Sequence, residues 1–137
     1  MPAIQRVLES ALYCEDVARA VVFYRDVLGL GVMSQGPRLA ALDAGGATVL
    51  LLFHRGATTQ GLDFPGGRVP PHDGAGPTHL AFAVGDDELD AWEQRLASHG
   101  VAIESRARWT LGGRSIYFRD PDQHSLELVT PRTWPNY

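Results

Sequence analysis

The sequence lacks several features that would place it in whole classes of protein. It has a single cysteine, Cys14, which excludes an internal disulfide and a multi-cysteine zinc site. It has no basic tract, and 12 Lys and Arg against 16 Asp and Glu give a formal net charge of -4. Its longest strongly apolar run, 47–53, is far shorter than the roughly 20 residues of a membrane helix, and its first ten residues lack the apolar centre of a signal peptide. We therefore expect a cytoplasmic protein without a nucleic-acid or membrane partner.

The length and composition fit one ordinary globular domain. The chain has 137 residues, of which 45% are hydrophobic and 20% charged. These proportions allow a sizeable buried core and are not those of a disordered or collagen-like chain. We expect a single domain over 1–137.

An internal repeat organises that domain. The segment ESALYCED at 9–16 aligns with HLAFAVGD at 79–86, an offset of 70 residues. Each segment alternates like a strand, ends in Asp, and is followed by a helix-like stretch that a glycine ends, at Gly29 and Gly100. The Asp residues, Asp16 and Asp86, are well placed as helix N-caps.

Three further strands are expected in each half of the chain. They lie at about 31–35, 38–43 and 47–54, and at 101–108, 113–119 and 124–130. The fold class is therefore α+β, with βαβββ modules at 1–55 and 78–137. The Gly- and Pro-rich segment 56–77 between them resists regular structure, and either covers a pocket or is a plain linker.

The alternation of side chains along a strand separates a core face from a face suited to a cavity. The cavity face carries Glu9 and His79 at equivalent positions of the two first strands, and Glu127 on the last strand. Alignment of the last strands places Leu50 opposite Glu127, within one residue, with Leu52 on the same side. Three protein ligands with open positions are typical of a catalytic metal centre, and two carboxylates with one imidazole suit Zn²⁺, Ni²⁺, Mn²⁺ or Mg²⁺.

Each of these three residues also has an ordinary structural interpretation. His79 could be a core histidine that is hydrogen-bonded within the sheet. Glu9 and Glu127 could be buried or edge carboxylates that pair with an arginine. The spacing alone leaves both interpretations open.

Three longer segments resemble the vicinal oxygen chelate superfamily. They are ALYCEDVARAVVFYRDVLGL at 11–30, THLAFAV at 78–84 and IYFRDPDQHSLELV at 116–129. The superfamily includes glyoxalase I, fosfomycin-resistance transferases, methylmalonyl-CoA epimerase, extradiol dioxygenases and bleomycin-resistance proteins. The resemblance implies paired βαβββ modules that curl into an open cup, and often a homodimer whose site is shared between chains.

The resemblance also implies roles for particular residues. His79 and Glu127 match the family's usual metal ligands, and Glu9 replaces its first-strand His or Gln. Leu50 lies where glyoxalase I has a carboxylate that is a fourth ligand. Gln123 replaces glycine in the family's DPDG turn, a change expected to alter local turn geometry more than chemistry.

The resulting hypothesis is a glyoxalase-like lyase or isomerase that uses a divalent metal, of Zn, Ni, Mn or Fe, on a small oxygen-chelating substrate. The metal would stabilise an enolate or oxyanion. Tyr117 and Arg119 are the expected catalytic groups, as proton donor and anion clamp. The expected substrate-binding residues are Leu50, Leu52, His72, Trp109 and Ser115.

Several of these residues also have an ordinary structural interpretation that competes with the functional one. Tyr117 could simply be a wall residue, Arg119 a surface partner of Asp120 or Asp122, and His72 a solvated loop residue. Trp109 could serve only in packing, and His124 is expected at the surface.

Two other functions remain open. One is a drug-binding resistance protein without metal chemistry. The other is an extradiol-type dioxygenase, which Glu9 disfavours because such Fe(II) enzymes typically use two histidines and one carboxylate. Tyr117 matches the active-site tyrosine of the fosfomycin transferases. Fosfomycin modification is nevertheless not favoured, because Ala107 or a neighbour stands where those enzymes have a lysine.

Overall fold

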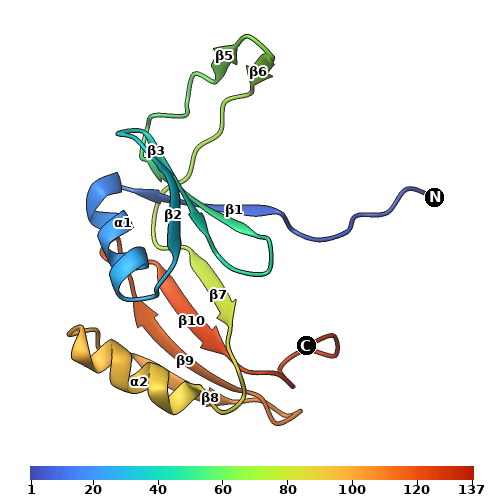
Figure 1. Ribbon diagram of the computed structural model, residues 1–137, viewed down its shortest axis with the longest axis vertical. Helices are drawn as coiled ribbons and strands as arrows, with labels where there is room; N and C mark the ends of the chain where they lie inside the picture. Colours follow the sequence, from blue (N-terminus) through green and yellow to red (C-terminus); the bar gives the residue numbers. More distant parts are fainter. The chain divides into compact units, whose positions relative to one another are not determined.

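The computed structural model describes all residues, 1–137, and the chain divides into two compact units, Met1–Ala75 and Gly76–Tyr137. It contains two helices and ten strands (Figure 1), which confirms the α+β fold class. Each unit contains one four-stranded open sheet and one helix.

The first unit follows the predicted βαβββ order. Its elements are β1 (Glu9–Cys14), α1 (Val17–Asp26), β2 (Gly31–Gln35), β3 (Leu39–Asp43) and β4 (Val49–His54). The sheet order is β1-β4-β3-β2, in which β1 runs parallel to β4 and the other neighbours are antiparallel.

The second unit repeats this topology. Its elements are β7 (His79–Ala83), α2 (Leu89–Ser98), β8 (Ser105–Arg108), β9 (Arg114–Arg119) and β10 (Ser125–Val129). The sheet order is β7-β10-β9-β8, again with one parallel pair, β7 with β10. The expected strand at 101–108 is shorter, because only its last four residues pair with β9.

The two helices begin differently. Asp16 caps α1 as predicted, since its carboxylate accepts a hydrogen bond from the Arg19 amide at 3.0 Å. The same prediction for Asp86 is wrong, because α2 begins after Glu88, and Asp86 instead pairs with Arg132 at 2.7 Å. Gly29 and Gly100 end the two helices at positive φ, as expected of C-terminal glycines.

Each helix covers one face of its own sheet, and the core of each unit lies between that helix and that sheet (Figure 1). In the first unit the buried hydrophobic side chains come from β1, α1 and the turn after it, β3 and β4: Leu12, Cys14, Val17, Ala20, Val21, Tyr24, Val27, Leu28, Ala40, Leu42, Leu50 and Leu52. In the second they are Val84, Leu89, Leu96, Ile116, Phe118, Leu126, Leu128 and Val129. The opposite face of each sheet is left for polar groups and cavities.

The Gly- and Pro-rich segment is more regular than its composition indicates. It contains a hairpin of β5 (Leu62–Phe64) and β6 (Gly67–Val69), joined by Pro65 and Gly66. Proline and glycine favour such a turn, and the apolar residues on either side supply the two strands. The hairpin projects from the sheet of the first unit (Figure 1).

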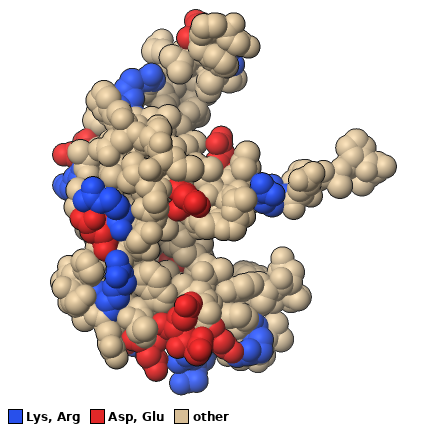
Figure 2. Space-filling model, in the orientation of Figure 1, with Lys and Arg blue, Asp and Glu red and all other residues tan.

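Charged side chains of both signs are mixed on the surface shown in Figure 2. Several form ion pairs within one unit, among them Arg25 with Asp26, Arg106 with Glu93 and Arg119 with Glu104. Neither helix is long and apolar enough to cross a bilayer.

Candidate metal centre and neighbouring pocket

His79 and Glu127 meet on the second sheet, away from α2. His79 begins β7 and Glu127 lies on the adjacent strand β10, so the parallel pairing brings them together. The Nε2 atom of His79 lies 3.2 Å from Oε2 of Glu127. The histidine side chain is 52% exposed and the glutamate side chain 8%. The histidine therefore reaches solvent, whereas the glutamate is buried.

The other ring nitrogen of His79 fixes the tautomer of the neutral ring. Nδ1 lies 2.8 Å from the carbonyl oxygen of Ser125, which can only accept, so Nδ1 carries the proton. The lone pair of the neutral ring is then on Nε2, beside the carboxylate. A histidine that donates one N–H to a backbone carbonyl is the usual arrangement of a metal-binding imidazole.

Glu127 is held by a chain of hydrogen bonds. The Ser115 hydroxyl donates to Oε1 of Glu127 at 2.5 Å, and the Trp109 indole Nε1–H donates to the Ser115 oxygen at 2.7 Å. Ser115 is only 1% exposed, so it lies behind the carboxylate rather than at the surface. Ser115 and Trp109 therefore position Glu127, and neither contact requires a substrate.

Tyr117 and Arg119 lie on β9 on the same side as Ser115. Tyr117 pairs with Glu127 across the sheet, and its ring centroid is 6.2 Å from that of His79. Burial raises the pKa of the Tyr117 hydroxyl, and the negative charge of Glu127 raises it further. The Tyr117 hydroxyl therefore stays protonated at neutral pH and can donate a hydrogen bond.

The guanidinium of Arg119 is already engaged. It donates twice to the carboxylate of Glu104, at 2.6 and 3.1 Å, and once to the Gln123 carbonyl oxygen at 3.0 Å. The sequence suggested Asp120 or Asp122 as its surface partner, and Glu104 has that place.

His124, expected at the surface, is 1% exposed. Its Nδ1 accepts a hydrogen bond from the Thr78 amide at 3.0 Å, so it joins the start of β7 to the turn before β10. Its position after Asp122 in a polar turn gave no signal of this burial.

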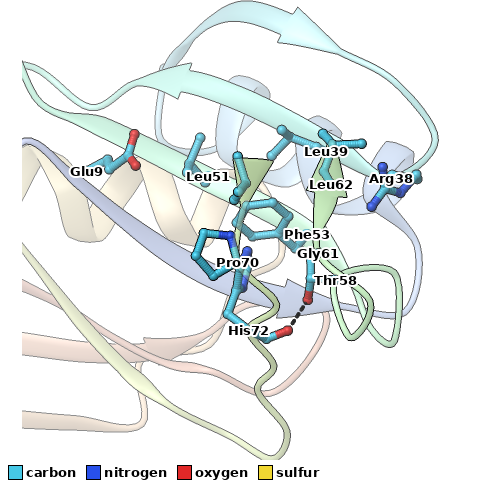
Figure 3. A pocket seen from close by; sticks show the side chains of 11 residues that line it. Glu9, Arg38, Leu39, Leu51, Phe53, Thr58, Gly61, Leu62, Pro70 and His72 are labelled. Atoms are coloured by element: carbon cyan, nitrogen blue, oxygen red, sulfur yellow. Dashed lines mark hydrogen bonds between the residues drawn. The ribbon is translucent and has the colours of Figure 1, made fainter. Parts of the chain in front are cut away.

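The first unit carries the second part of the candidate site. A pocket of about 230 Å³ lies on the face of the sheet opposite α1, and Glu9 lies at its edge (Figure 3). Its walls come from β1, β3, β4 and the segment that holds the hairpin: Glu9, Arg38, Leu39, Leu51, Phe53, Thr58, Gly61, Leu62, Val69, Pro70 and His72.

The expectation that Leu50 and Leu52 face this cavity is wrong. They are 0% and 1% exposed and belong to the core beneath α1. The pocket is lined by their neighbours, Leu51 and Phe53. The register explains the slip: Glu9 pairs with Val49 and His79 pairs with Ser125, so the counterpart of Glu127 is Leu51.

His72 lines the pocket as part of an anchored segment rather than a solvated loop. Its Nδ1 lies 2.5 Å from the Tyr13 hydroxyl, and its backbone exchanges hydrogen bonds with Thr58 (Figure 3). Burial, with the charge of Asp73, raises the pKa of Tyr13, which keeps this hydroxyl protonated at neutral pH.

Comparison with known proteins decides the family. The sequence model of the Glyoxalase/Bleomycin resistance protein/Dioxygenase superfamily matches residues 4–128. The chain belongs to this superfamily. The resemblance inferred from the three sequence segments is thereby confirmed.

Two curated relatives illustrate the glyoxalase superfamily match. The chain is 29% identical over 128 residues to the metallothiol transferase FosB of Staphylococcus saprophyticus, covering 93% of this chain and 78% of the relative. It is 31% identical over 125 residues to the glutathione transferase FosA of Serratia marcescens, covering 91% and 80%. Among solved structures, lactoylglutathione lyase from Agrobacterium tumefaciens superposes with a TM-score of 0.87 at 31% identity, covering 98% of this chain and 99% of that one.

The residues of the second unit fit the divalent ion that the glyoxalase superfamily resemblance implies. A separation of 3.2 Å between Nε2 and Oε2 suits two ligands of one ion at about 2.0–2.2 Å each. His79 and Glu127 are two ligands without a third beside them. The structure contains no cluster of three or more His, Cys, Asp or Glu side chains arranged around a common point. The third expected ligand, Glu9, lies in the first unit, where its carboxylate makes no hydrogen bond or ion pair.

Proposed function

We propose that this protein is a metal-dependent, glyoxalase-like enzyme that acts on a small oxygen-chelating substrate as a lyase or isomerase. The observation that carries the proposal is the His79–Glu127 pair, with its fixed tautomer and its buried, hydrogen-bonded carboxylate. His79 and Glu127 would hold the ion, and Glu9 would complete the ligand set. The ion would supply Lewis-acid stabilisation of an enolate or oxyanion.

The side chains around the pair have separate tasks in this proposal. Ser115 and Trp109 hold Glu127 in one orientation, so the carboxylate presents Oε2 outward. Tyr117 stays protonated at neutral pH and donates a hydrogen bond or a proton to a substrate oxygen. Arg119 would serve as an anion clamp only after it exchanges Glu104 for a substrate carboxylate.

The relatives narrow the substrates that should be screened first. The FosB and FosA names specify thiol or glutathione transfer, and the structural neighbour is a lactoylglutathione lyase. We therefore propose thiol adducts of 2-oxoaldehydes as the first substrates to test, followed by epimerisable acyl thioesters.

The test is metal content per chain, measured by elemental analysis on protein purified without chelator. We expect one divalent ion per chain, lost in His79→Ala and Glu127→Ala. The matched controls are His99→Ala and Glu104→Ala, which change the same residue types outside the pair. A folded wild-type protein that takes up no Zn²⁺, Ni²⁺, Mn²⁺ or Fe²⁺ after reconstitution would overturn the proposal.

We also propose a homodimer that shares its sites between chains, and mixing two inactive variants tests this. If Glu9 joins the pair of a second chain, co-refolded Glu9→Ala and His79→Ala chains regain part of the metal binding that each lacks alone. If the ligands come from one chain, the mixture regains none. Sedimentation gives the oligomeric state independently.

A drug-binding protein without metal chemistry is the second candidate. The apolar lining of the pocket in the first unit favours it, because such a surface binds a ligand without a metal. Tight ligand binding with no ion in the purified protein would select this candidate. Oxygen uptake with catechols would instead select the dioxygenase alternative.

A further inference from the structure

The pocket in the first unit has a distinct chemical gradient. Glu9 lies at one end and Arg38 at the other, with apolar side chains between them (Figure 3). Leu51 and Phe53 come from the sheet, while Leu62 and Val69 form a cross-strand pair of the hairpin. The hairpin thus supplies one apolar wall and the sheet another.

Arg38 lacks a carboxylate partner. Its Nη2 donates to the backbone carbonyl oxygen of Ala57, and the structure contains no ion pair between Arg38 and any acidic side chain. By contrast, Arg25, Arg68 and Arg119 are each paired with a nearby carboxylate. Arg38 therefore keeps guanidinium N–H groups for an anion at this end of the pocket.

The strand register gives the spacing between Glu9 and Arg38 along β4. Glu9 pairs with Val49, whereas the carbonyl oxygen of Arg38 accepts the amide of His54, five residues further along β4. At about 3.3 Å per residue, the two ends are separated by roughly 17 Å of strand. A ligand that contacts both Glu9 and Arg38 must therefore be an elongated molecule.

We propose that this pocket binds an amphipathic anion, with an apolar chain or ring against Leu51, Phe53 and the hairpin and its carboxylate on Arg38. This inference rests on the proposed function in one respect: Glu9 is taken as the metal-side end, so the chelating oxygens of the substrate would lie there. It narrows the substrate class to molecules with chelating oxygens, an apolar middle and a distal carboxylate.

Straight-chain carboxylates test the pocket without any metal. Binding of butanoate, hexanoate and octanoate to chelator-treated protein is measured by calorimetry. Affinity should rise by up to about fifteenfold for each two added methylenes, which is 0.8 kcal/mol per buried methylene. An affinity that does not change with chain length would overturn the proposal.

Two pairs of variants locate the bound anion. Arg38→Gln should weaken hexanoate about tenfold and leave the uncharged 1-hexanol unchanged, whereas Arg25→Gln, on α1, should change neither. Leu62→Glu should abolish hexanoate binding, whereas Phe64→Glu should not. Leu62 and Phe64 lie on the same short strand with 47% and 51% exposure, but only Leu62 lines the pocket.

The outcomes separate this inference from the proposed function. All four side chains lie at the surface of the first unit, and an unchanged melting temperature shows that each variant folds. Protein that binds one ion through His79 and Glu127 but no hexanoate keeps the proposed function and overturns this inference. Protein that binds hexanoate through Arg38 but no ion does the reverse.

Discussion

The Ser115 hydroxyl donates a hydrogen bond to Glu127 from the neighbouring strand, and both side chains are buried. The hydroxyl binds Oε1, and the other carboxylate oxygen, Oε2, lies beside His79. The hydrogen bond from Ser115 therefore sets the direction in which the Glu127 carboxylate faces. The metal binding proposed for the second unit therefore depends on a residue that need not touch a substrate.

Ser115→Ala should weaken metal binding by about 10- to 100-fold, the usual effect of losing a hydrogen bond to a metal ligand. It should also cost about 1–3 kcal/mol of unfolding free energy, because Trp109 and Glu127 each lose a buried partner. Metal titration and urea unfolding measure the two effects. Ser98→Ala on α2 is the control, and equal metal affinity in both variants would contradict the positioning role.

Leu50→Ala and Leu51→Ala should differ although the residues are neighbours. Leu50 is fully buried beneath α1, so its truncation should cost about 2–5 kcal/mol. Leu51 lines the pocket and is only partly buried, so Leu51→Ala should cost less and instead weaken ligand binding. Denaturant unfolding of both variants checks this assignment. A larger loss of unfolding free energy for Leu51→Ala than for Leu50→Ala would contradict the assignment of the buried face of β4 to Leu50.

Gln123→Gly should stabilise the protein. Gln123 has φ 68, a left-handed conformation that costs an L-residue about 1–2 kcal/mol. Its side chain is exposed, and the carbonyl oxygen that accepts from Arg119 is kept by glycine. We expect a net gain near 1 kcal/mol in thermal unfolding, since glycine also adds freedom to the unfolded chain. Gln60→Gly, at a residue without positive φ, should give no gain.

The Glu104–Arg119 pair predicts a pH dependence. The hydrogen bonds from Arg119 lower the pKa of Glu104 below its ordinary value. A carboxylate with a lowered folded-state pKa stabilises the fold above its unfolded pKa, and that contribution is lost as the pH falls through the folded pKa. In an NMR titration, Arg119→Gln should raise the midpoint of Glu104, whereas Arg25→Gln should not. Because Glu104 is exposed, the effect on overall stability should be small.

The repeat made much of the fold predictable. Alternation in ESALYC and HLAFAV identified the two opening strands, and the faces of β9 and β10 were assigned correctly because polar and apolar residues alternate there. The same alternation places His79 and Glu127 on one face of their sheet, where the structure has them 3.2 Å apart. In β4 the run VLLLF is apolar on both faces, so periodicity gave no register and the pocket side was assigned one residue out.

Other features depend on contacts that the sequence does not encode locally. The burial of His124 follows from its hydrogen bond to Thr78, 46 residues earlier. The anchoring of His72 follows from Tyr13, 59 residues away. The hairpin at β5 and β6 was hidden because glycine and proline are common in both turns and irregular loops.

The two units have matching strand orders, but corresponding positions of their sheets carry side chains of different kinds. Where the second unit has Glu127, Tyr117 and Ser115, the register of the first unit places Leu51, Ala41 and Leu39. On the assignments proposed above, the second unit supplies His79 and Glu127 to the ion, whereas the first supplies Glu9 and the apolar pocket. Substitutions in the pocket of the first unit should then change which molecules bind without altering the His79–Glu127 pair.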